Sequence, residues 1–386
     1  MAGTGEAAGP SRPAPCRRHR AEEVAMSTET IGAEVGEAAT ESFAERVFGD
    51  YAGANAFFLA GIGDRLGLFR ELATGGEATA EELAARTHLR ERYLREWLGG
   101  MVAAGYLRYD PTSARYALPP EHVPVLAEEA GPRFLGNAFF DFSTNFGETF
   151  RLLLEAFRTG GGVPQEAYGE EVALSIDRYT APWFEHRLIP EWLPLMPAVR
   201  ELLEAGCTVC DVGCGRGRGL IRLAEAFPRC RMVGIDAYEP AVRAASDLAR
   251  EAGVADRVAF EIADGAAGLP GPFDVVTTFD VLHDSADPGG LLRAIRRALA
   301  PGGRYVCLDI NCSERPEDNV GPMGTVLYGL SLAYCLPVSL AGGGAGLGTL
   351  GLPETRLRDL AIRAGFSQVR RVPIDDPFNN LYEVSP

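Results

Sequence analysis

One histidine of the chain stands between aspartates in a stretch that could carry acid–base chemistry. The segment TTFDVLHDSADP (277–288) places His283 three residues after Asp280 and directly before Asp284, at the end of an apolar run. Histidine exchanges protons near neutral pH, and a placed base of this kind accelerates proton removal from a bound hydroxyl group. The segment therefore predicts either a general base or a polar residue that closes a buried strand.

A glycine-rich segment, VCDVGCGRGRG (209–219), follows a β-like run and precedes a helical one. It has the pattern D-x-G-x-G-x-G, formed by Asp211 and by three glycines at alternating positions, Gly213, Gly215 and Gly217. Glycines let the backbone approach a ligand closely, and the amide end of the following helix is positive. The dinucleotide pattern GxGxxG fails, because Arg218 and Leu220 stand where its last glycine would be. A carboxylate beside the loop would repel a pyrophosphate but suits the ammonium group of an amino-acid moiety.

Alternating strands and helices from residue 207 onward must position both segments. Short β-rich runs are separated by segments of helical period, and the runs lie at 207–213, 231–236, 258–263, 273–279 and 304–310. This alternation predicts an α/β fold with a Rossmann-like, doubly wound, mostly parallel sheet. Its ligand site should lie at the carboxyl ends of the strands.

An N-terminal, mainly helical region (41–130) predicts a winged-helix-like domain. Thr79 and Glu82 have the spacing of a capping box at a helix start, and a second helix with an apolar stripe follows. Two short β-runs around Asp110 then resemble a wing hairpin. The region carries nine Arg against fourteen acidic residues, which disfavours DNA reading and favours a dimerisation or lid role.

Composition excludes several classes of protein. The formal net charge of −16 argues against a nucleic-acid partner. All 37 basic residues are arginine, so neither a phosphate-loop lysine nor a lysine Schiff base is available. Cys207, Cys210 and Cys214 lie within or beside an apolar strand and are expected to be small buried residues in a reduced cytosol. No metal site is predicted.

The remaining regions differ in composition from these two domains. Residues 1–40 are predicted to be a disordered tail, and translation from Met1 or from Met26 stays open. Residues 131–200 are rich in aromatics and predict a helical linker that contributes to a substrate pocket. Residues 201–386 form the predicted ligand-binding domain.

An uncharged stretch, 319–353, is long enough to span a bilayer. Pro337, the run Gly342–Gly344 and the lack of flanking basic residues favour a buried pocket wall instead. We therefore expect a cytoplasmic protein with no membrane association.

The glycine segment resembles the first motif of class I S-adenosylmethionine-dependent methyltransferases. The resemblance implies that Asp211 and the three loop glycines hold the methionine part of S-adenosylmethionine, with S-adenosylhomocysteine as the product. Asp236, at the end of the second strand, matches the position that binds the ribose hydroxyls. Asp264 and Gly265 match the adenine position, and Asp280 lies where the family holds the methionine moiety.

Over residues 41–386 the order of parts resembles a narrower group, the small-molecule O-methyltransferases of plant caffeic acid type and their bacterial relatives. In that group a His-Asp pair follows the fourth strand, as His283 and Asp284 do here, and the histidine is the catalytic base. A carboxylate at the end of the fifth strand flanks the base, and Asp309 occupies this position as Asp instead of the usual Glu. Glu354 is near the position of a second flanking glutamate, although its spacing differs. Ser285 stands where the plant-type motif has Trp.

The resemblance implies O-methylation of a small apolar or aromatic hydroxyl compound by a homodimer, with His283 as base and Asp309 as its orienting partner. Three alternatives stay open. One is N- or C-methylation of a small molecule by proximity. A second is a cofactor-binding transcriptional regulator that uses the winged helix, and a third is a protein that retains the cofactor without transferring a methyl group.

Overall fold

The computed structural model describes residues 37–129, 131–136, 138 and 149–386. The chain divides into two compact units, one ending at Tyr51 and the other running from Ala52 to Pro386. Most of the predicted tail and most of the aromatic run 133–150 lie outside the described residues.

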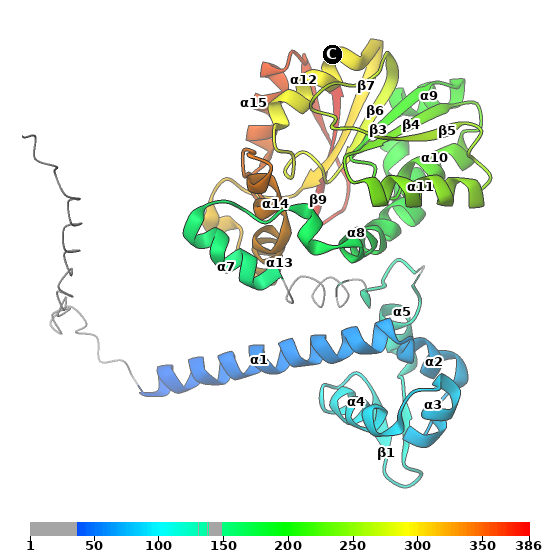
Figure 1. Ribbon diagram of the computed structural model, residues 1–386, viewed down its shortest axis with the longest axis vertical. Coiled ribbons are helices and arrows are strands. Elements are labelled where there is room, and N and C mark those ends of the chain that lie inside the picture. The colour runs from blue at the N-terminus through cyan, green and yellow to red at the C-terminus, as the bar shows by residue number, and fades with distance from the viewer. Residues whose placement is uncertain (1–36, 130, 137, 139–148) are drawn as a thin grey trace, which may run out of the picture. The chain divides into compact units, whose positions relative to one another are not determined.

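The N-terminal region has the predicted order of helices followed by a hairpin (Figure 1). Thr79 and Glu82 form the capping box, with Glu82 N donating to Thr79 Oγ1 at 3.2 Å and Thr79 N donating to Glu82 Oε2 at 3.1 Å. The elements are α1 (Glu37–Arg65), α2 (Leu68–Gly75), α3 (Ala80–Thr87), α4 (Glu91–Ala103), β1 (Arg108–Asp110), β2 (Arg115–Ala117) and α5 (Val123–Leu126). The predicted apolar stripe of α4 is buried at Leu94, Trp97, Leu98 and Met101. These features confirm the winged-helix prediction.

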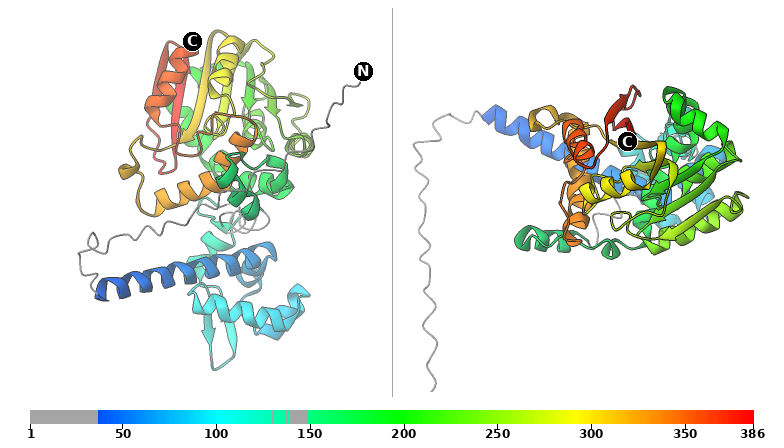
Figure 2. Two further views of the ribbon diagram at one scale, coloured as in Figure 1. Left: turned by 60° about the vertical axis from the view of Figure 1, so that its left-hand side comes forward. Right: turned by 90° about the horizontal axis from the view of Figure 1, so that it is seen from above.

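A seven-stranded sheet forms the centre of the C-terminal region, with strand order β5-β4-β3-β6-β7-β9-β8. The strands are β3 (Thr208–Val212), β4 (Arg231–Asp236), β5 (Val258–Ile262), β6 (Phe273–Phe279), β7 (Leu299–Ile310), β8 (Gln368–Val372) and β9 (Asn379–Ser385). All neighbouring pairs are parallel except those of β9, which runs antiparallel to β7 and β8. Figure 2 shows these two last strands, in red, together at one side of the sheet. The mostly parallel, doubly wound prediction is confirmed.

Helices cover both faces of this sheet (Figure 1). One face packs against α9 (Pro197–Ala205), α10 (Arg218–Ala226) and α11 (Glu239–Glu251). The other face packs against α12 (Pro288–Ala298) and α15 (Glu354–Arg363). Because both faces are covered, the central strands are mainly apolar, and the buried hydroxyls of Thr277 and Thr278 within β6 are hydrogen-bonded to Asp211 and Tyr305.

The uncharged stretch 319–353 is helical over Gly321–Ala341. It contains α13 (Gly321–Leu330), a π-helical turn (Ser331–Cys335) and α14 (Leu336–Ala341). Residues Gly321–Ala341 are long and apolar enough to cross a membrane, although a single such helix is weak evidence because core helices pass the same test. The expectation of a buried wall holds for one side only. Gly324, Leu327, Ser331 and Cys335 form a buried stripe, whereas Val326, Tyr328 and Leu332 are exposed.

The segment before the sheet supplies two further helices and a π-helix. They are α7 (Thr149–Thr159), α8 (Glu170–Pro182) and the π-helix Trp183–Trp192. Trp183 and Trp192 are buried in the same core as α9 and α10. The linker is therefore packed into the sheet domain.

Candidate functional site

The glycine segment forms the turn between β3 and α10, with all three glycines in the left-handed region at φ values of 71°, 53° and 77°. A Cβ atom on Gly213 would lie 2.5 Å from Val281, and one on Gly217 would lie 2.4 Å from the Phe260 ring. Nothing lies within 4 Å of the corresponding position on Gly215. The outer glycines are thus required by close packing, and the middle one leaves open space beside the turn.

Asp211 lies at the end of β3 beneath this turn and is 3% exposed. Its Oδ1 accepts a hydrogen bond from the Thr277 hydroxyl at 2.6 Å. Burial raises the pKa of Asp211 to about 7, although the Thr277 hydrogen bond opposes the shift and the charge of Asp236 adds to it. A buried carboxylate of this kind is stabilised by a cationic partner.

Asp236 ends β4 and holds the glycine turn. Its carboxylate accepts hydrogen bonds from Gly215 N and from Tyr238 N, each at 2.8 Å. Burial raises the pKa of Asp236, against the effect of these backbone amides. A carboxylate accepts about four hydrogen bonds, so capacity remains for a ligand hydroxyl.

Asp264 and Gly265 follow β5. Asp264 is exposed, and its Oδ1 accepts a hydrogen bond from Ala266 N at 2.9 Å. Gly265 is buried, and a Cβ atom there would lie 2.4 Å from Val212. The two residues form a turn at the same sheet edge as the glycine segment, and their contacts to adenine stay a prediction.

His283 lies in the turn after β6 and is 3% exposed. Its Nδ1 lies 2.8 Å from Asp309 Oδ1, and its Nε2 lies 3.1 Å from Asp284 Oδ1. Asp309, in β7, is 1% exposed and also accepts a hydrogen bond from Ile310 N at 2.9 Å. Burial alone would lower the pKa of His283, but the carboxylates of Asp284 and Asp309 raise it well above its ordinary value.

Asp280 begins the same turn with a left-handed backbone, at φ 57°. Its N–H donates to Leu308 O at 2.9 Å, which ties the turn to β7. Burial raises the pKa of Asp280 well above its ordinary value, and the nearby His283 charge opposes that shift. Such a residue gains from a cationic ligand, as Asp211 does.

The second carboxylate beside His283 is Asp284 and not Glu354. Glu354 instead binds Arg358 at 2.7 Å and Arg371 at 3.4 Å. Its position at the first residue of α15 turns it toward these arginines. Cys335 completes the surroundings of His283, since its sulfur lies within 4.8 Å of ligand atoms of His283 and Asp284.

The predicted cysteine cluster is structural in its placement. Cys210 and Cys214 are buried, and Cys207 Sγ lies 3.8 Å from Cys230 Sγ. Burial raises the pKa of Cys207 and Cys210 far above the ordinary thiol value. Burial thus favours the thiol form of Cys207 and Cys210, which is the less nucleophilic form.

Sequence reasoning missed Asp177, an acid of α8 that is 7% exposed and binds the arginines of the glycine turn. Arg218 donates two hydrogen bonds to it, at 3.0 and 2.8 Å, and Arg216 Nε lies 3.4 Å away. The two arginines that alternate with the glycines indicate an acidic partner close to the turn. Only the tertiary structure places that partner, Asp177, on α8.

The strand order, the D-x-G-x-G-x-G turn after the first parallel strand and the acids at the next strand ends are those of a methyltransferase domain, and a winged-helix domain precedes it. Residues 203–325 match the family model "Methyltransferase domain", and residues 54–128 match "Rv2258c-like winged HTH domain".

Curated relatives match part of this chain. It is 44% identical over 110 residues to a 27-O-demethylrifamycin SV methyltransferase from Amycolatopsis mediterranei, covering 28% of this chain and 40% of that protein. It is 38% identical over 108 residues to a ubiquinone biosynthesis O-methyltransferase from Pseudomonas paraeruginosa, covering 28% of this chain and 46% of that protein. The chain thus spans less than half the length of either relative.

Solved structures share the fold over most of the chain. The mitomycin 7-O-methyltransferase MmcR is 22% identical, with a TM-score of 0.66, and the match covers 91% of this chain and 99% of that chain. Human N-acetylserotonin methyltransferase in complex with SAM is 20% identical, with a TM-score of 0.64, and the match covers 89% and 97%. At these identities the likeness establishes the fold.

Proposed function

We propose that this protein is an S-adenosylmethionine-dependent O-methyltransferase whose acceptor is a small apolar or aromatic hydroxyl compound. His283 acts as the general base, Asp309 orients its ring, and Asp284 sets its proton affinity. The observation that carries the proposal is the buried His283–Asp309 pair, 2.8 Å apart, in the turn whose Val281 packs on Gly213 of the glycine turn. Base and cofactor turn are therefore neighbours.

The residues present fit the cofactor. Gly215 offers open backbone, and Asp211 and Asp236 are acids with raised pKa that a cationic, hydroxyl-bearing ligand would stabilise. S-adenosylmethionine supplies an electrophilic methyl group on a sulfonium. The chain's own residues align the acceptor and exclude water, and such alignment lowers a barrier by about 7–11 kcal/mol. His283 then takes the hydroxyl proton at Nε2, which requires Asp284 to yield its place at that atom.

The same proposal covers the partners and the location of the protein. We propose a homodimer formed through the N-terminal region, because α1 exposes Phe43, Val47, Phe48 and Tyr51, and apolar patches of this kind mark interfaces. A cytoplasmic location accords with the eight cysteines of the chain, because their number and spacing do not predict a disulfide framework. The DNA-binding alternative is disfavoured, because Arg92 and Arg95 of α4 pair with Glu96 and Glu91 on the same helix.

The decisive test combines binding and turnover. Calorimetry with S-adenosylhomocysteine should show one site per chain, and a methyl-transfer screen over phenols and hydroxylated polyketides should reveal an acceptor. Absence of binding to a folded protein would refute the cofactor assignment. Turnover of amines with no turnover of any hydroxyl compound would replace O-methylation by N-methylation.

Cofactor affinity should depend on the protonation of Asp211, whose pKa is raised to about 7. Binding an ammonium group requires the ionised carboxylate, so below pH 7 a proton must leave first. We expect the affinity for S-adenosylhomocysteine to fall by about tenfold per pH unit below pH 7, and Asp211→Asn should weaken binding and flatten this dependence. The stability of the free protein has the opposite pH dependence. Protonated Asp211 contributes fully to the stability of the fold below the ordinary pKa of 3.8, and this contribution is lost as the pH rises through about 7.

Asp284→Asn should move the pH–rate profile to lower pH. The Asp284 carboxylate is the first of the groups that raise the pKa of His283, so its neutralisation lets the imidazole lose its proton at lower pH. The acid limb of kcat/KM, measured with the acceptor found above, reports this change. An unshifted limb would show that His283 is not the titrating base.

A further inference from the structure

A buried acid on α8 binds both arginines of the glycine turn. Asp177 is 7% exposed, and its two carboxylate oxygens accept hydrogen bonds from Arg218 Nε and Nη2 at 3.0 and 2.8 Å. Arg216 Nε lies 3.4 Å from the same carboxylate. The fork of Arg218 is therefore engaged in the planar two-bond geometry that fixes orientation as well as distance.

The position of these arginines makes their anchoring matter for the turn. Arg216 and Arg218 flank Gly217, which is the N-cap of α10 and has a left-handed backbone. Their side chains are drawn to α8, whereas Gly215, on the other side of Arg216, faces open space. Asp177 thus holds two side chains of the turn, whereas the space beside Gly215 is open.

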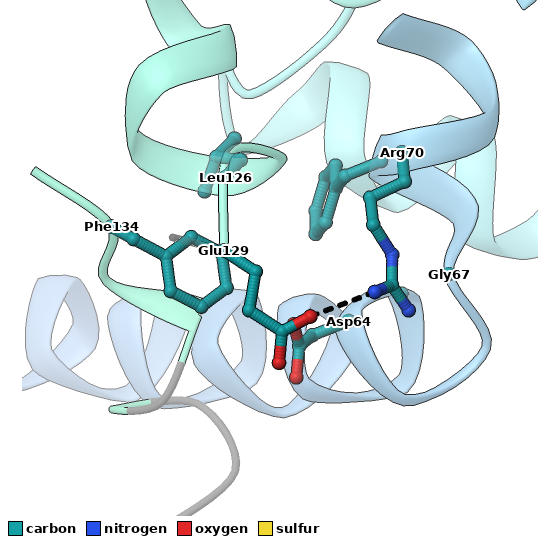
Figure 3. A pocket seen from close by; sticks show the side chains of 8 residues that line it. Asp64, Gly67, Arg70, Leu126, Glu129 and Phe134 are labelled. Carbon is teal, nitrogen blue, oxygen red and sulfur yellow. Dashed lines mark hydrogen bonds and ion pairs between the residues drawn. The ribbon is translucent and has the colours of Figure 1, made fainter. Parts of the chain in front are cut away.

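Arg178, the next residue of α8, is held by ion pairs of its own. Arg178 donates to both oxygens of Asp64 at 2.8 and 3.0 Å and to Glu129 at 3.1 Å, and its guanidinium lies 5.7 Å from the centre of the Phe134 ring. Figure 3 shows these two acids, Asp64 and Glu129, and the hydrogen bond that Arg70 donates to Glu129 at 2.8 Å. Asp64 belongs to α1 and is 9% exposed.

We infer that Asp177 is a positioning residue for the cofactor turn and that the Arg178–Asp64 pair holds it in place. The affinity for the cofactor then depends on two partly buried ion pairs whose residues need not touch it. This inference rests on the proposed cofactor, but the state of the turn can be measured without any ligand.

The energetic reason is the cost of an unmatched buried charge. Removing Asp177 leaves the charges of the partly buried Arg216 and Arg218 without this partner, and an uncompensated charge away from water is destabilising. With Asp177 neutralised, Arg218 keeps only the longer bond from Nη1 to Glu185 at 3.3 Å, and both arginines become free to move toward solvent. Since they flank Gly217, the turn moves with them.

The test compares Asp177→Asn with a matched control, Glu383→Gln. Glu383 is also a 7% exposed carboxylate bound by two arginines, Arg370 and Arg304, but it lies in β9. We expect Asp177→Asn to weaken S-adenosylhomocysteine binding by about 10- to 100-fold and to speed hydrogen exchange of the 213–219 amides in the free protein. Glu383→Gln should lower Tm by a similar amount with unchanged affinity and turn exchange.

Three further variants sharpen the result. Asp177→Glu keeps the charge and should restore part of the affinity, which also covers the case in which Asp177→Asn fails to fold. Asp64→Asn should weaken binding by roughly 3- to 10-fold, and Arg70→Gln, which removes an exposed pair, should not. In turnover, KM for S-adenosylmethionine should rise while kcat at saturation stays near wild type.

Two outcomes would overturn the inference: wild-type affinity and turn exchange in Asp177→Asn, or equal weakening in Glu383→Gln. If the wild type binds no S-adenosylhomocysteine, the proposed cofactor is wrong. Hydrogen exchange of the turn then still decides whether Asp177 holds it.

Discussion

His283→Gln is expected to lower kcat for a hydroxyl acceptor by about 10²–10⁴-fold, which is the usual contribution of a placed general base. Glutamine keeps a polar group of similar reach but cannot accept and release a proton near neutral pH. Affinity for S-adenosylhomocysteine should stay unchanged, because the glycine turn and the acids at the strand ends are intact. Single-turnover methyl transfer and calorimetry measure the two quantities separately.

Asp309→Asn tests the same assignment from the other ring nitrogen. Asp309 lies 2.8 Å from His283 Nδ1, so a neutral amide there removes the charge that orients the ring and favours the imidazolium. The rate should fall, by less than in His283→Gln. His122→Gln is the control, since His122 bonds to Tyr106 O in the N-terminal region and should keep the wild-type rate. A full rate in His283→Gln would eliminate the base and leave proximity as the mechanism.

Gly217→Ala is expected to abolish measurable cofactor binding. A Cβ atom would lie 2.4 Å from the Phe260 ring and 3.0 Å from Ala245, at a backbone φ of 77°. The left-handed backbone costs about 1–2 kcal/mol for a residue with a Cβ, and overpacking a core adds about 1–3 kcal/mol. The turn must shift to relieve both, and the backbone geometry that faces the ligand is lost.

Gly253→Ala separates the two costs. Gly253, after α11, has a φ of 69° and nothing within 4 Å of its Cβ position, so alanine there meets the backbone cost alone. We expect a small loss of Tm and normal binding of S-adenosylhomocysteine. Unchanged binding in Gly217→Ala would mean that the Phe260 ring moves aside and that the turn tolerates a side chain.

The strand ends could be predicted because their signals are local. A buried parallel strand is a short apolar run, so the polar residue that ends it stands out, as Asp211, Asp236 and Asp280 do. The D-x-G-x-G-x-G spacing is equally local, since each glycine is required by a close contact or a positive φ angle within the turn. For these residues the chain order alone gives the edge of the sheet at which they meet.

Other features depend on contacts that no spacing encodes. Asp177 and Arg218 are 41 residues apart, and nothing in the aromatic-rich segment around Asp177 distinguishes it from the other acids there. Asp284 directly follows His283 in the sequence, so their nearness could be predicted. Its position at His283 Nε2 follows from the turn that Asp280 begins with a left-handed backbone.

The sequence by itself determined the class of fold, the glycine turn and the likeness to S-adenosylmethionine-dependent methyltransferases, since periodicity and short motifs express backbone requirements over a few residues. Only the tertiary structure decided which carboxylates surround His283, that Glu354 binds arginines instead, and that Asp177 of α8 binds the arginines of the glycine turn. Buried charges need partners, and those partners are supplied by whichever element packs beside them, however distant in the chain.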